Sequence, residues 1–257
     1  MTALDLRPEP GAAAAHRLVL GHARFEVVQL LRNGEQLLLT LVIPIVLLVL
    51  MAKVEIIDLG TGTAARLDFL VPGILCLAVL STAFTGLAIG TGFERRYGVL
   101  KRLGSTPLTR SQLLAGKSLA VLLVELGQVV LLCAVGVALG WRPIHPSYPI
   151  ALLFLVVGTV AFASLGLLMA GTLRAEVTLA AANLVYVLLL LGGGIVVPTS
   201  KFPPGVARWL EWLPSSALAT GLRAALNGGS LATHALVILV VWALVGFVAA
   251  ARLFRWE

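Results

Sequence analysis

Six long apolar runs divide the 257-residue chain, and they limit its fold more than any other feature. They cover residues 36–52, 69–92, 118–140, 148–173, 177–197 and 231–251. A helix needs about 20 apolar residues to cross a bilayer, with a range of about 17 to 25. The runs fall within or close to this range and alternate with short loops. This pattern predicts an all-α, polytopic membrane protein in which residues 16–257 form one domain with six transmembrane helices.

The composition supports a membrane protein over a soluble one. Hydrophobic residues make up 59% of the chain and charged residues 12%, whereas soluble domains carry about 25% charged residues. The net charge of +7 would suit a nucleic acid partner, but the basic residues lie in loops between apolar runs, a pattern that favours anionic lipid headgroups. We therefore expect the lipid bilayer, and no nucleic acid, as a partner. Cys76 and Cys133 lie inside apolar runs and are expected to be buried and unpaired.

The distribution of Lys and Arg predicts how the chain crosses the membrane. If the N-terminus is cytoplasmic, thirteen of these residues lie on the inner side and six on the outer side. Cytoplasmic loops carry the excess of basic residues, so both termini are expected in the cytoplasm. Residues 1–15 contain Asp5, Glu9 and two prolines in place of the apolar core of a signal peptide. We expect them to form a disordered cytoplasmic tail.

Residues 16–35 differ from the runs that follow because they combine an apolar face with a polar one. The apolar face is formed by Val19, Ala23, Val27, Leu30 and Leu31. The opposite side carries His22, Glu26, Gln29 and Asn33. Such a helix is typical of segments that lie along a membrane surface. We therefore predict an interfacial helix along the inner leaflet; the alternative is that this segment extends the first transmembrane helix.

The longest charged segment, residues 93–117, lies between the second and third apolar runs. Its apolar residues at helical spacing are Tyr97, Leu100 and Leu103. This spacing predicts a short amphipathic helix. Gly104 and Pro107 are expected to end it, since proline disfavours helix in the residue before it. Because a loop has no lipid to cover apolar side chains, we expect this stripe to be buried on another protein.

A capping box predicts where the following helix begins. Thr109 and Gln112 have the spacing at which two side chains bond reciprocally with the backbone. Gly116 and Lys117 look like the end of a phosphate-binding loop, but Ser111 stands where that motif requires glycine. The segment also begins a helix with no strand before it. We therefore expect no nucleotide-binding site in this chain.

This charged segment resembles the cytoplasmic loop of type-two ATP-binding-cassette (ABC) exporter permeases. The residues that carry the resemblance are Glu94, Gly98, Leu100, Leu103, Thr106, Pro107, Leu108, Arg110, Gly116 and Lys117. In that family the loop carries a coupling helix that docks on a separate ATPase subunit. The resemblance implies that the ATPase-coupling residues are Glu94, Arg95, Arg96, Tyr97, Gly98, Leu100, Leu103, Pro107 and Arg110. Lys101 departs from the pattern, since family members often carry an acid there, and the alternative is a solvated loop that obeys the positive-inside rule.

The resemblance covers residues 18–253 and implies a transport subunit without enzymatic activity of its own. Two six-span permeases, expected to be identical, would assemble with two ATPase subunits that bind ATP and Mg. The substrate would be a hydrophobic or amphipathic drug, natural product or lipid, exported across the bacterial plasma (inner) membrane. An exporter of polysaccharides or lipid-linked glycans is the alternative within the family. Outside it, an integral-membrane lipid-modifying enzyme would require clustered His, Asp or Glu, and an ion-coupled transporter would require several ionisable residues within the membrane; the sequence shows neither pattern.

The segment 201–229 is too apolar for an ordinary loop and too interrupted to span a membrane. One helical face is formed by Val206, Trp209, Leu210 and Leu213. Pro214 is expected to break this helix, and Ser215 or Ser216 to cap a second one. Trp212 and the tryptophan in the apolar face suit the level of the lipid headgroups. The family resemblance implies a pair of short re-entrant helices on the outer side; the alternative is a flat interfacial helix.

Several polar residues and glycines inside the runs are candidates for a substrate path or gate. They are Glu125, Gln128, Asn183, Tyr186, Gly192, Gly193 and Gly194. A charge within a span is costly and so points to function, but Glu125 and Gln128, one turn apart, also suit hydrogen bonds between helices. Asn183 and Tyr186 favour the same hydrogen-bonding role. The three glycines would let the outer end of the fifth span bend or unwind, with simple packing as the alternative.

Overall fold

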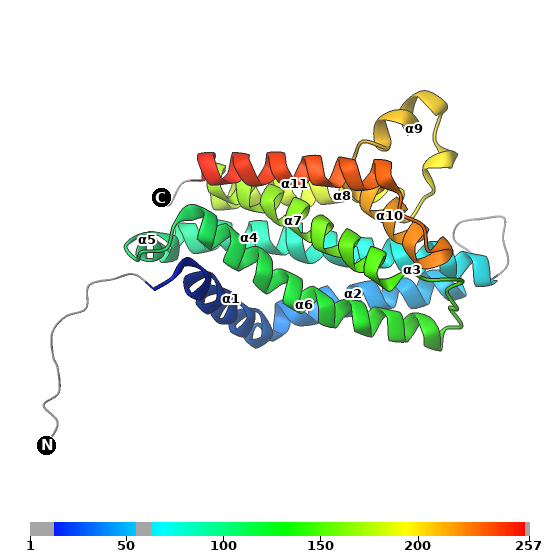
Figure 1. Cartoon of the computed structure of the whole chain (residues 1–257), viewed down its shortest axis with the longest axis horizontal. Coiled ribbons are helices and arrows are strands. Elements are labelled where there is room, and N and C mark those ends of the chain that lie inside the picture. The colour runs from blue at the N-terminus through cyan, green and yellow to red at the C-terminus, as the bar shows by residue number, and fades with distance from the viewer. Residues whose placement is uncertain (1–12, 55–62, 255–257) are drawn as a thin grey trace, which may run out of the picture.

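The computed structural model describes residues 13–54 and 63–254, and every regular element within these ranges is a helix. The all-α prediction is therefore confirmed. The helices are α1 (Ala15–Arg32), α2 (Gly34–Lys53), α3 (Thr63–Val79), the π-helix η1 (Leu80–Gly86), α4 (Leu87–Arg96), α5 (Val99–Gly104), α6 (Arg110–Ala138), α7 (Tyr148–Thr172), α8 (Ala175–Gly192), the 3₁₀-helix η2 (Thr199–Lys201), α9 (Pro204–Leu210), α10 (Pro214–Gly228) and α11 (Thr233–Leu253). The long helices run along one axis of an elongated bundle (Figure 1). Most of the predicted tail, residues 1–15, lies outside the described residues.

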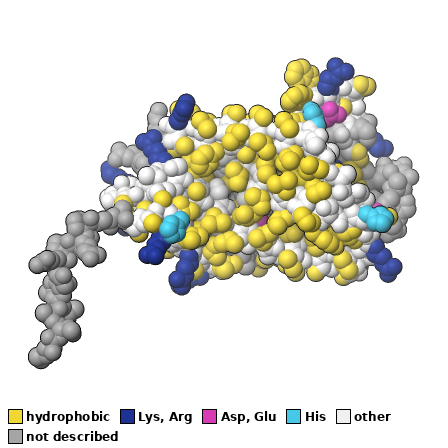
Figure 2. Space-filling model, viewed as in Figure 1, with side chains coloured by type: hydrophobic (Ala, Val, Ile, Leu, Met, Phe, Trp, Pro, Cys, Tyr) yellow, Lys and Arg dark blue, Asp and Glu magenta, His cyan; other side chains and the backbone are white. Residues whose placement is uncertain are grey.

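Five helical stretches are long and apolar enough to cross a membrane. They are Arg66–Arg96, Arg110–Ala138, Tyr148–Thr172, Ala175–Gly192 and Thr233–Leu253. Hydrophobic side chains cover the flank of the bundle, while Lys and Arg side chains lie near its two ends (Figure 2). α2 (20 residues) corresponds to the first predicted span, and within it Thr40–Lys53 is a shorter apolar helix. The chain is thus a polytopic membrane protein, with five predicted spans confirmed as helices of spanning length.

The second span is a single helical rod that changes its winding midway, from α3 through η1 to α4. Near the start of η1, the Ser81 hydroxyl donates to the Leu77 carbonyl at 2.8 Å. A hydroxyl that bonds to the preceding turn competes with the backbone hydrogen bonds of a helix. The rod is also the most buried of the five stretches, so it forms the centre of the bundle.

α1 is a separate helix, because Asn33 ends it before α2 begins. This result excludes the extension of the first span, while a place at the inner leaflet stays a prediction. The polar side of α1, rather than its apolar face, supplies most of its contact with the protein. Its buried residues are His22, Ala23 and Glu26, whereas Leu31 of the predicted apolar face is 56% exposed. α1 turns these polar side chains inward because it lies against α6, where Glu26 bonds to a buried lysine (Figure 1).

The segment between α8 and α11 contains two short helices, as predicted. α10 packs against α3, α7 and α11, whereas α9 has no buried residue. Trp209 and Trp212 are 77% and 57% exposed. Ser215 and Ser216 are buried and do not cap α10; instead Pro214 begins the helix, a position where proline needs no hydrogen-bond partner for its nitrogen. The location of this pair of helices on the outer side stays a prediction.

Candidate functional site

The charged segment folds into a tight connection between the second and third spans. Gly98 adopts a left-handed conformation with φ of 72°, which glycine tolerates because it lacks a Cβ atom. α5 follows directly and lies at one end of the bundle (Figure 1). The Gln112 N–H donates to Thr109 Oγ1 at 3.3 Å, and the Thr109 N–H donates to Gln112 Oε1 at 2.9 Å. The predicted short helix and the predicted capping box are both confirmed.

The prediction that the apolar stripe of this segment faces a partner is wrong for Leu100. Leu100 is fully buried, at 0% exposure, and belongs to the hydrophobic core of this chain. Leu103 packs against the same core. Tyr97 lies before α5 and is 71% exposed. Leu100 therefore anchors α5 to its own bundle. The connection between the second and third spans is short, so one side of α5 packs against the ends of these spans.

Two arginines predicted at the docking surface instead hold the end of α4 to the connection between α7 and α8. Arg95 donates from its guanidinium to the Leu173 carbonyl. Arg96 forms an ion pair with Glu176 of α8. Both side chains of this pair are more than half exposed, so the pair itself contributes only about 0–1 kcal/mol. Together the contacts join the end of α4, which leads into α5, to the connection between α7 and α8.

The surface that α5 leaves exposed is basic and partly apolar. Tyr97 and Val99 are 71% and 39% exposed. The other exposed residues predicted or expected here are Lys101, Arg102, Pro107 and Arg110. A protein partner can contact this surface without any rearrangement of the buried side of α5.

A buried charge cluster lies behind the end of the bundle that carries α5. Lys117 of α6 is 1% exposed, and its Nζ lies 2.7 Å from Glu26 Oε1 of α1 and 2.8 Å from Glu94 Oε2 of α4. Two carboxylates thus share one ammonium group. Removing one partner of a buried ion pair typically costs about 3–5 kcal/mol, because the other charge stays buried. The cluster therefore fixes α1 on the bundle, next to the part of α4 that leads into α5.

His22 lies on one side of this cluster. Its Nε2 is 3.4 Å from Glu26 Oε1. Burial, reinforced by the positive charge of Lys117, lowers the pKa of His22 from 6.5 to about 4, although Glu94 acts in the opposite direction. His22 is therefore neutral at pH 7. A Cβ atom at Gly116 would approach the His22 ring to 2.7 Å, so this glycine allows α1 and α6 to pack closely.

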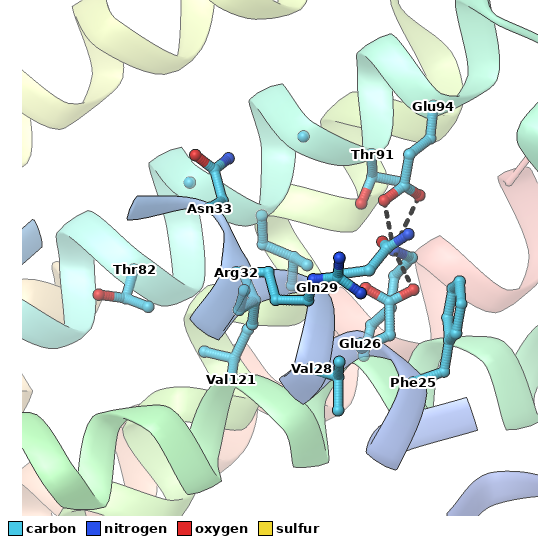
Figure 3. Close-up of a pocket in the computed structure, with 15 residues that line it drawn as sticks. Phe25, Glu26, Val28, Gln29, Arg32, Asn33, Thr82, Thr91, Glu94 and Val121 are labelled. Carbon is cyan, nitrogen blue, oxygen red and sulfur yellow. Dashed lines mark hydrogen bonds and ion pairs between the residues drawn. The ribbon is translucent and has the colours of Figure 1, made fainter. Parts of the chain in front are cut away.

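A cavity of about 560 Å³ lies beside the charge cluster, between α1, the rod formed by η1 and α4, and α6. Apolar side chains that line it are Phe25, Val28, Leu87 and Val121. Figure 3 shows the carboxylates of Glu94 and Glu26 pointing toward each other from α4 and α1. Pockets with mostly apolar walls and a few convergent polar groups are typical of small-molecule sites. The arrangement can hold a molecule with both an apolar and a polar part.

Comparison with known proteins decides the family. Residues 52–252 match the model of the ABC-2 family transporter proteins. The chain belongs to the ABC-2 transporter family. A protein of Bacillus subtilis (strain 168) named as a transport permease, YvfS, is 23% identical over 218 residues, which cover 84% of this chain and 89% of that protein. ABC transporter G family member 20 of Dictyostelium discoideum is 29% identical over 164 residues, which cover 63% of this chain and 22% of that protein.

The family resemblance inferred from the charged segment is thereby confirmed. The chain is the membrane subunit of an ABC-2 transport permease, and membership of the family implies an ATPase partner. The grouping of His22, Glu26 and Glu94 resembles the clustering that a membrane enzyme would require. In this permease, however, Lys117 engages both carboxylates.

The polar residues predicted inside the spans of the permease connect its helices. Glu125 is 2% exposed and accepts a hydrogen bond from Thr159 Oγ1 of α7. Gln128, also 2% exposed, accepts from Thr82 Oγ1 of η1 at 3.1 Å and donates to the Thr40 carbonyl of α2 at 3.3 Å. Both residues face the interior of the bundle, as predicted. These contacts favour hydrogen bonding between helices, and a role in a substrate path stays a prediction.

The two residues of the second predicted polar pair, Asn183 and Tyr186, make different kinds of contact. The Tyr186 and Ser81 hydroxyls are 3.3 Å apart, which joins α8 to η1. Asn183 is exposed and donates to the Leu179 carbonyl of its own helix. Hydrogen bonding between helices is therefore confirmed for Tyr186, whereas the Asn183 side chain bonds within its own helix.

α8 of the permease ends at Gly192, earlier than the predicted span, because the following glycines leave the helix. Gly194 has a φ of 63°, a conformation that favours glycine. A side chain at Gly193 would collide with Ser215 at the start of α10. Arg223 of α10 donates to the Gly194 carbonyl at 2.7 Å. These contacts support close packing at the glycines, while a hinge or gate stays a prediction.

The partners of Lys117 were not predicted from the sequence, in which His22 and Glu26 lie on the polar side of α1 and Lys117 lies among the loop cations. One signal could have identified the cluster. Lys117 lies two turns inside the helix that Thr109 caps, where a charge requires a partner.

Proposed function

We propose that this permease works in an ATP-driven exporter and moves a hydrophobic or amphipathic molecule out of the cell with a separate ATPase subunit. The observation that carries the proposal is the exposed surface around α5. Leu100 holds α5 from the inside, and Arg95 and Arg96 hold the adjoining end of α4. A short helix anchored in this way can transmit the movement of a docked subunit to α4 and α6, the helices on either side of it.

Docking would use Tyr97 and Val99 as apolar contacts, surrounded by the charges of Lys101, Arg102 and Arg110. Burying a large apolar side chain contributes about 1.5–3 kcal/mol, whereas charges at the edge of an interface mainly change the association rate. In this proposal the ATPase binds ATP and Mg, and the permease supplies the docking surface and the membrane path.

The proposed assembly contains two copies of the permease and two ATPase subunits in the bacterial plasma membrane. The start of α1 and the end of α11 lie at the same end of the bundle as α5 (Figure 1). Placing that end in the cytoplasm puts thirteen of the nineteen Lys and Arg residues on the inner side, as the positive-inside rule requires. Both termini would then be cytoplasmic, and α9 and α10 would lie on the outer side.

Tyr97→Asp tests the docking surface. Because Tyr97 is 71% exposed, we expect the variant to fold and insert normally but to bind its ATPase about tenfold or more weakly, a loss of about 1.4 kcal/mol. The ATPase is expected to be encoded in a neighbouring reading frame. Co-purification from membranes and stimulation of ATP hydrolysis by the reconstituted permease measure the effect.

Tyr148→Asp is the matched control, because Tyr148 is 65% exposed at the start of α7, at the opposite end of the bundle (Figure 1). This variant should retain the ATPase at the wild-type level. Equal retention of the ATPase by both variants would remove α5 as the docking surface.

A further inference from the structure

The cluster of charged side chains beside the cavity contains more carboxylates than cations. When both carboxyl groups are ionised, Glu26 and Glu94 contribute two negative charges and Lys117 one positive charge; these side chains are 9%, 24% and 1% exposed. His22 contributes no charge, because it is neutral at pH 7. A charge held away from water is unfavourable unless a partner of opposite sign compensates it. The cluster therefore attracts one further positive charge.

Arg32 does not supply that charge. It lines the cavity from the last turn of α1, but its side chain is exposed to water. Among the side chains that the structure describes, Lys117 is the cation paired with Glu26 and Glu94. Water weakens the attraction between an exposed arginine and a carboxylate. The inner part of the cavity is consequently negative.

Thr91 provides an independent sign of a ligand. It is 1% exposed, yet its hydroxyl has no hydrogen-bond partner among the described residues. Thr91 lines the cavity one turn before Glu94. Figure 3 shows the Thr91 hydroxyl and the Glu94 carboxylate pointing to the same side of α4. Since buried polar groups nearly always have a partner, an ammonium group bound beside Glu94 could donate a hydrogen bond to the Thr91 hydroxyl.

We propose that this cavity binds a hydrophobic cation, meaning an apolar body that carries one positive centre. The positive centre would lie beside Glu94 and Thr91, and the apolar body against Phe25, Leu87 and Val121. The volume of about 560 Å³ suits a molecule of drug size. An amphiphilic amine and a lipid with an ammonium headgroup both offer this chemistry. Binding requires neither the ATPase nor export, so the outcome is independent of the proposed function.

Equilibrium binding of radiolabelled tetraphenylphosphonium to the purified full-length permease in dodecyl maltoside tests the site. Tetraphenylborate is the matched probe, because it has similar size and the same rings but carries a negative charge. We expect saturable binding of the cation to one site per chain, at least about tenfold tighter than binding of the anion. Equal binding of the two ions, or partitioning without saturation, would overturn the proposal.

Two variants test whether the cation binds in the cavity. Glu94→Gln removes the excess negative charge and should weaken cation binding by about tenfold or more. Gly90→Leu should abolish binding without changing any charge, because Gly90 lines the cavity and a Cβ atom there meets no atom within 4 Å.

Each variant has a matched control. Gly127→Leu also adds a side chain where a Cβ atom meets nothing within 4 Å, but on the exposed side of α6. Glu176→Gln removes a carboxylate that pairs with Arg96 outside the cavity. Both controls should bind the cation like the wild type. A folded, monodisperse Gly90→Leu protein that binds the cation with wild-type affinity would show that the cavity is not the site.

Competition separates the two sources of the cation. Lysophosphatidylethanolamine carries an ammonium group, and lysophosphatidylglycerol does not. Displacement of tetraphenylphosphonium by the first lipid alone assigns the site to a lipid headgroup, and displacement by neither assigns it to a cation that is not a lipid. Equal displacement by both lipids would show that the acyl chain binds without regard to charge and would contradict the proposal.

Discussion

At the scale of single residues, the charge on Lys117 determines which side chains surround it. A lysine within an apolar helix is costly unless its charge is compensated, and carboxylates from α1 and α4 lie 2.7 and 2.8 Å away. Buried ion pairs add little net stability, but breaking one is strongly unfavourable. We infer that the cluster fixes how α1, α4 and α6 meet more than it adds to the free energy of unfolding.

His22 makes the stability of this region depend on pH. The groups around it are Glu26 on its own helix, Lys117 on α6 and Glu94 on α4. Because the pKa of His22 falls from 6.5 to about 4 on folding, the unfolded chain takes up a proton at a higher pH than the folded protein. The stabilisation by neutral His22 is therefore complete above about pH 6.5 and is lost as the pH falls toward 4.

We accordingly expect the melting temperature of the purified permease to fall between pH 7.5 and pH 5, and to fall less in His22→Gln, which has no imidazole to protonate. Thermal unfolding in dodecyl maltoside at both pH values measures the difference. Carboxylates titrate in both proteins, so the comparison isolates His22. Parallel pH profiles for the two proteins would show that His22 is not desolvated as described.

At the scale of elements, α5 is a helix of six residues that cannot be stable alone. Its position comes from Leu100 inside the core and from the contacts of Arg95 and Arg96 at the end of α4. The buried side of α5 thus belongs to the permease, and only its other side is available to a partner. The same separation explains why Tyr97, rather than Leu100, is the residue with which to test docking.

Leu100→Ala should reduce the free energy of unfolding by about 2–5 kcal/mol, because the truncation leaves a cavity in a packed core. Val99→Ala is the matched control in the same turn, since Val99 is 39% exposed, and should change stability much less. Thermal melting of the purified variants without the ATPase measures both effects. Similar melting temperatures for the two variants would mean that Leu100 is not an anchor of α5.

At the scale of the whole molecule, the bundle has two chemically distinct ends. α5, the start of α1 and the end of α11 lie at one end, and α9 projects from the other end, where α10 packs into the bundle (Figure 1). The hydrophobic flank between them matches the interior of a bilayer (Figure 2). The two ends therefore lie on opposite sides of the membrane, and the count of basic residues predicts which side each occupies.

Single cysteines at Ser105 and Gly205 test this orientation in a background that lacks Cys76 and Cys133. Ser105 is exposed beside α5, and Gly205 is exposed in α9. A membrane-impermeant maleimide should label Gly205→Cys on intact cells and Ser105→Cys only after the membrane is opened. The reverse pattern would reject the proposed topology.

The sequence by itself determined the features that depend on neighbouring residues. The lengths of the apolar runs predict the spans because a helix must be continuous to cross a bilayer. The capping box of Thr109 and Gln112 and the short helix that becomes α5 also follow from side chains within a few positions of each other. The family resemblance was also visible in the sequence, because residues of the charged segment such as Gly98, Thr106 and Pro107 act on the local backbone.

Only the tertiary structure determined which part of the protein each helix face contacts. Glu26 and Lys117 are 91 positions apart, and nothing in the periodicity of α1 shows that its polar side lies against a buried lysine. Leu100 belongs to an apolar stripe, but spacing does not tell whether that stripe packs on the same chain or on a partner. Hydrophobic patterning shows which residues share a face, whereas burial depends on the three-dimensional path that brings distant helices together.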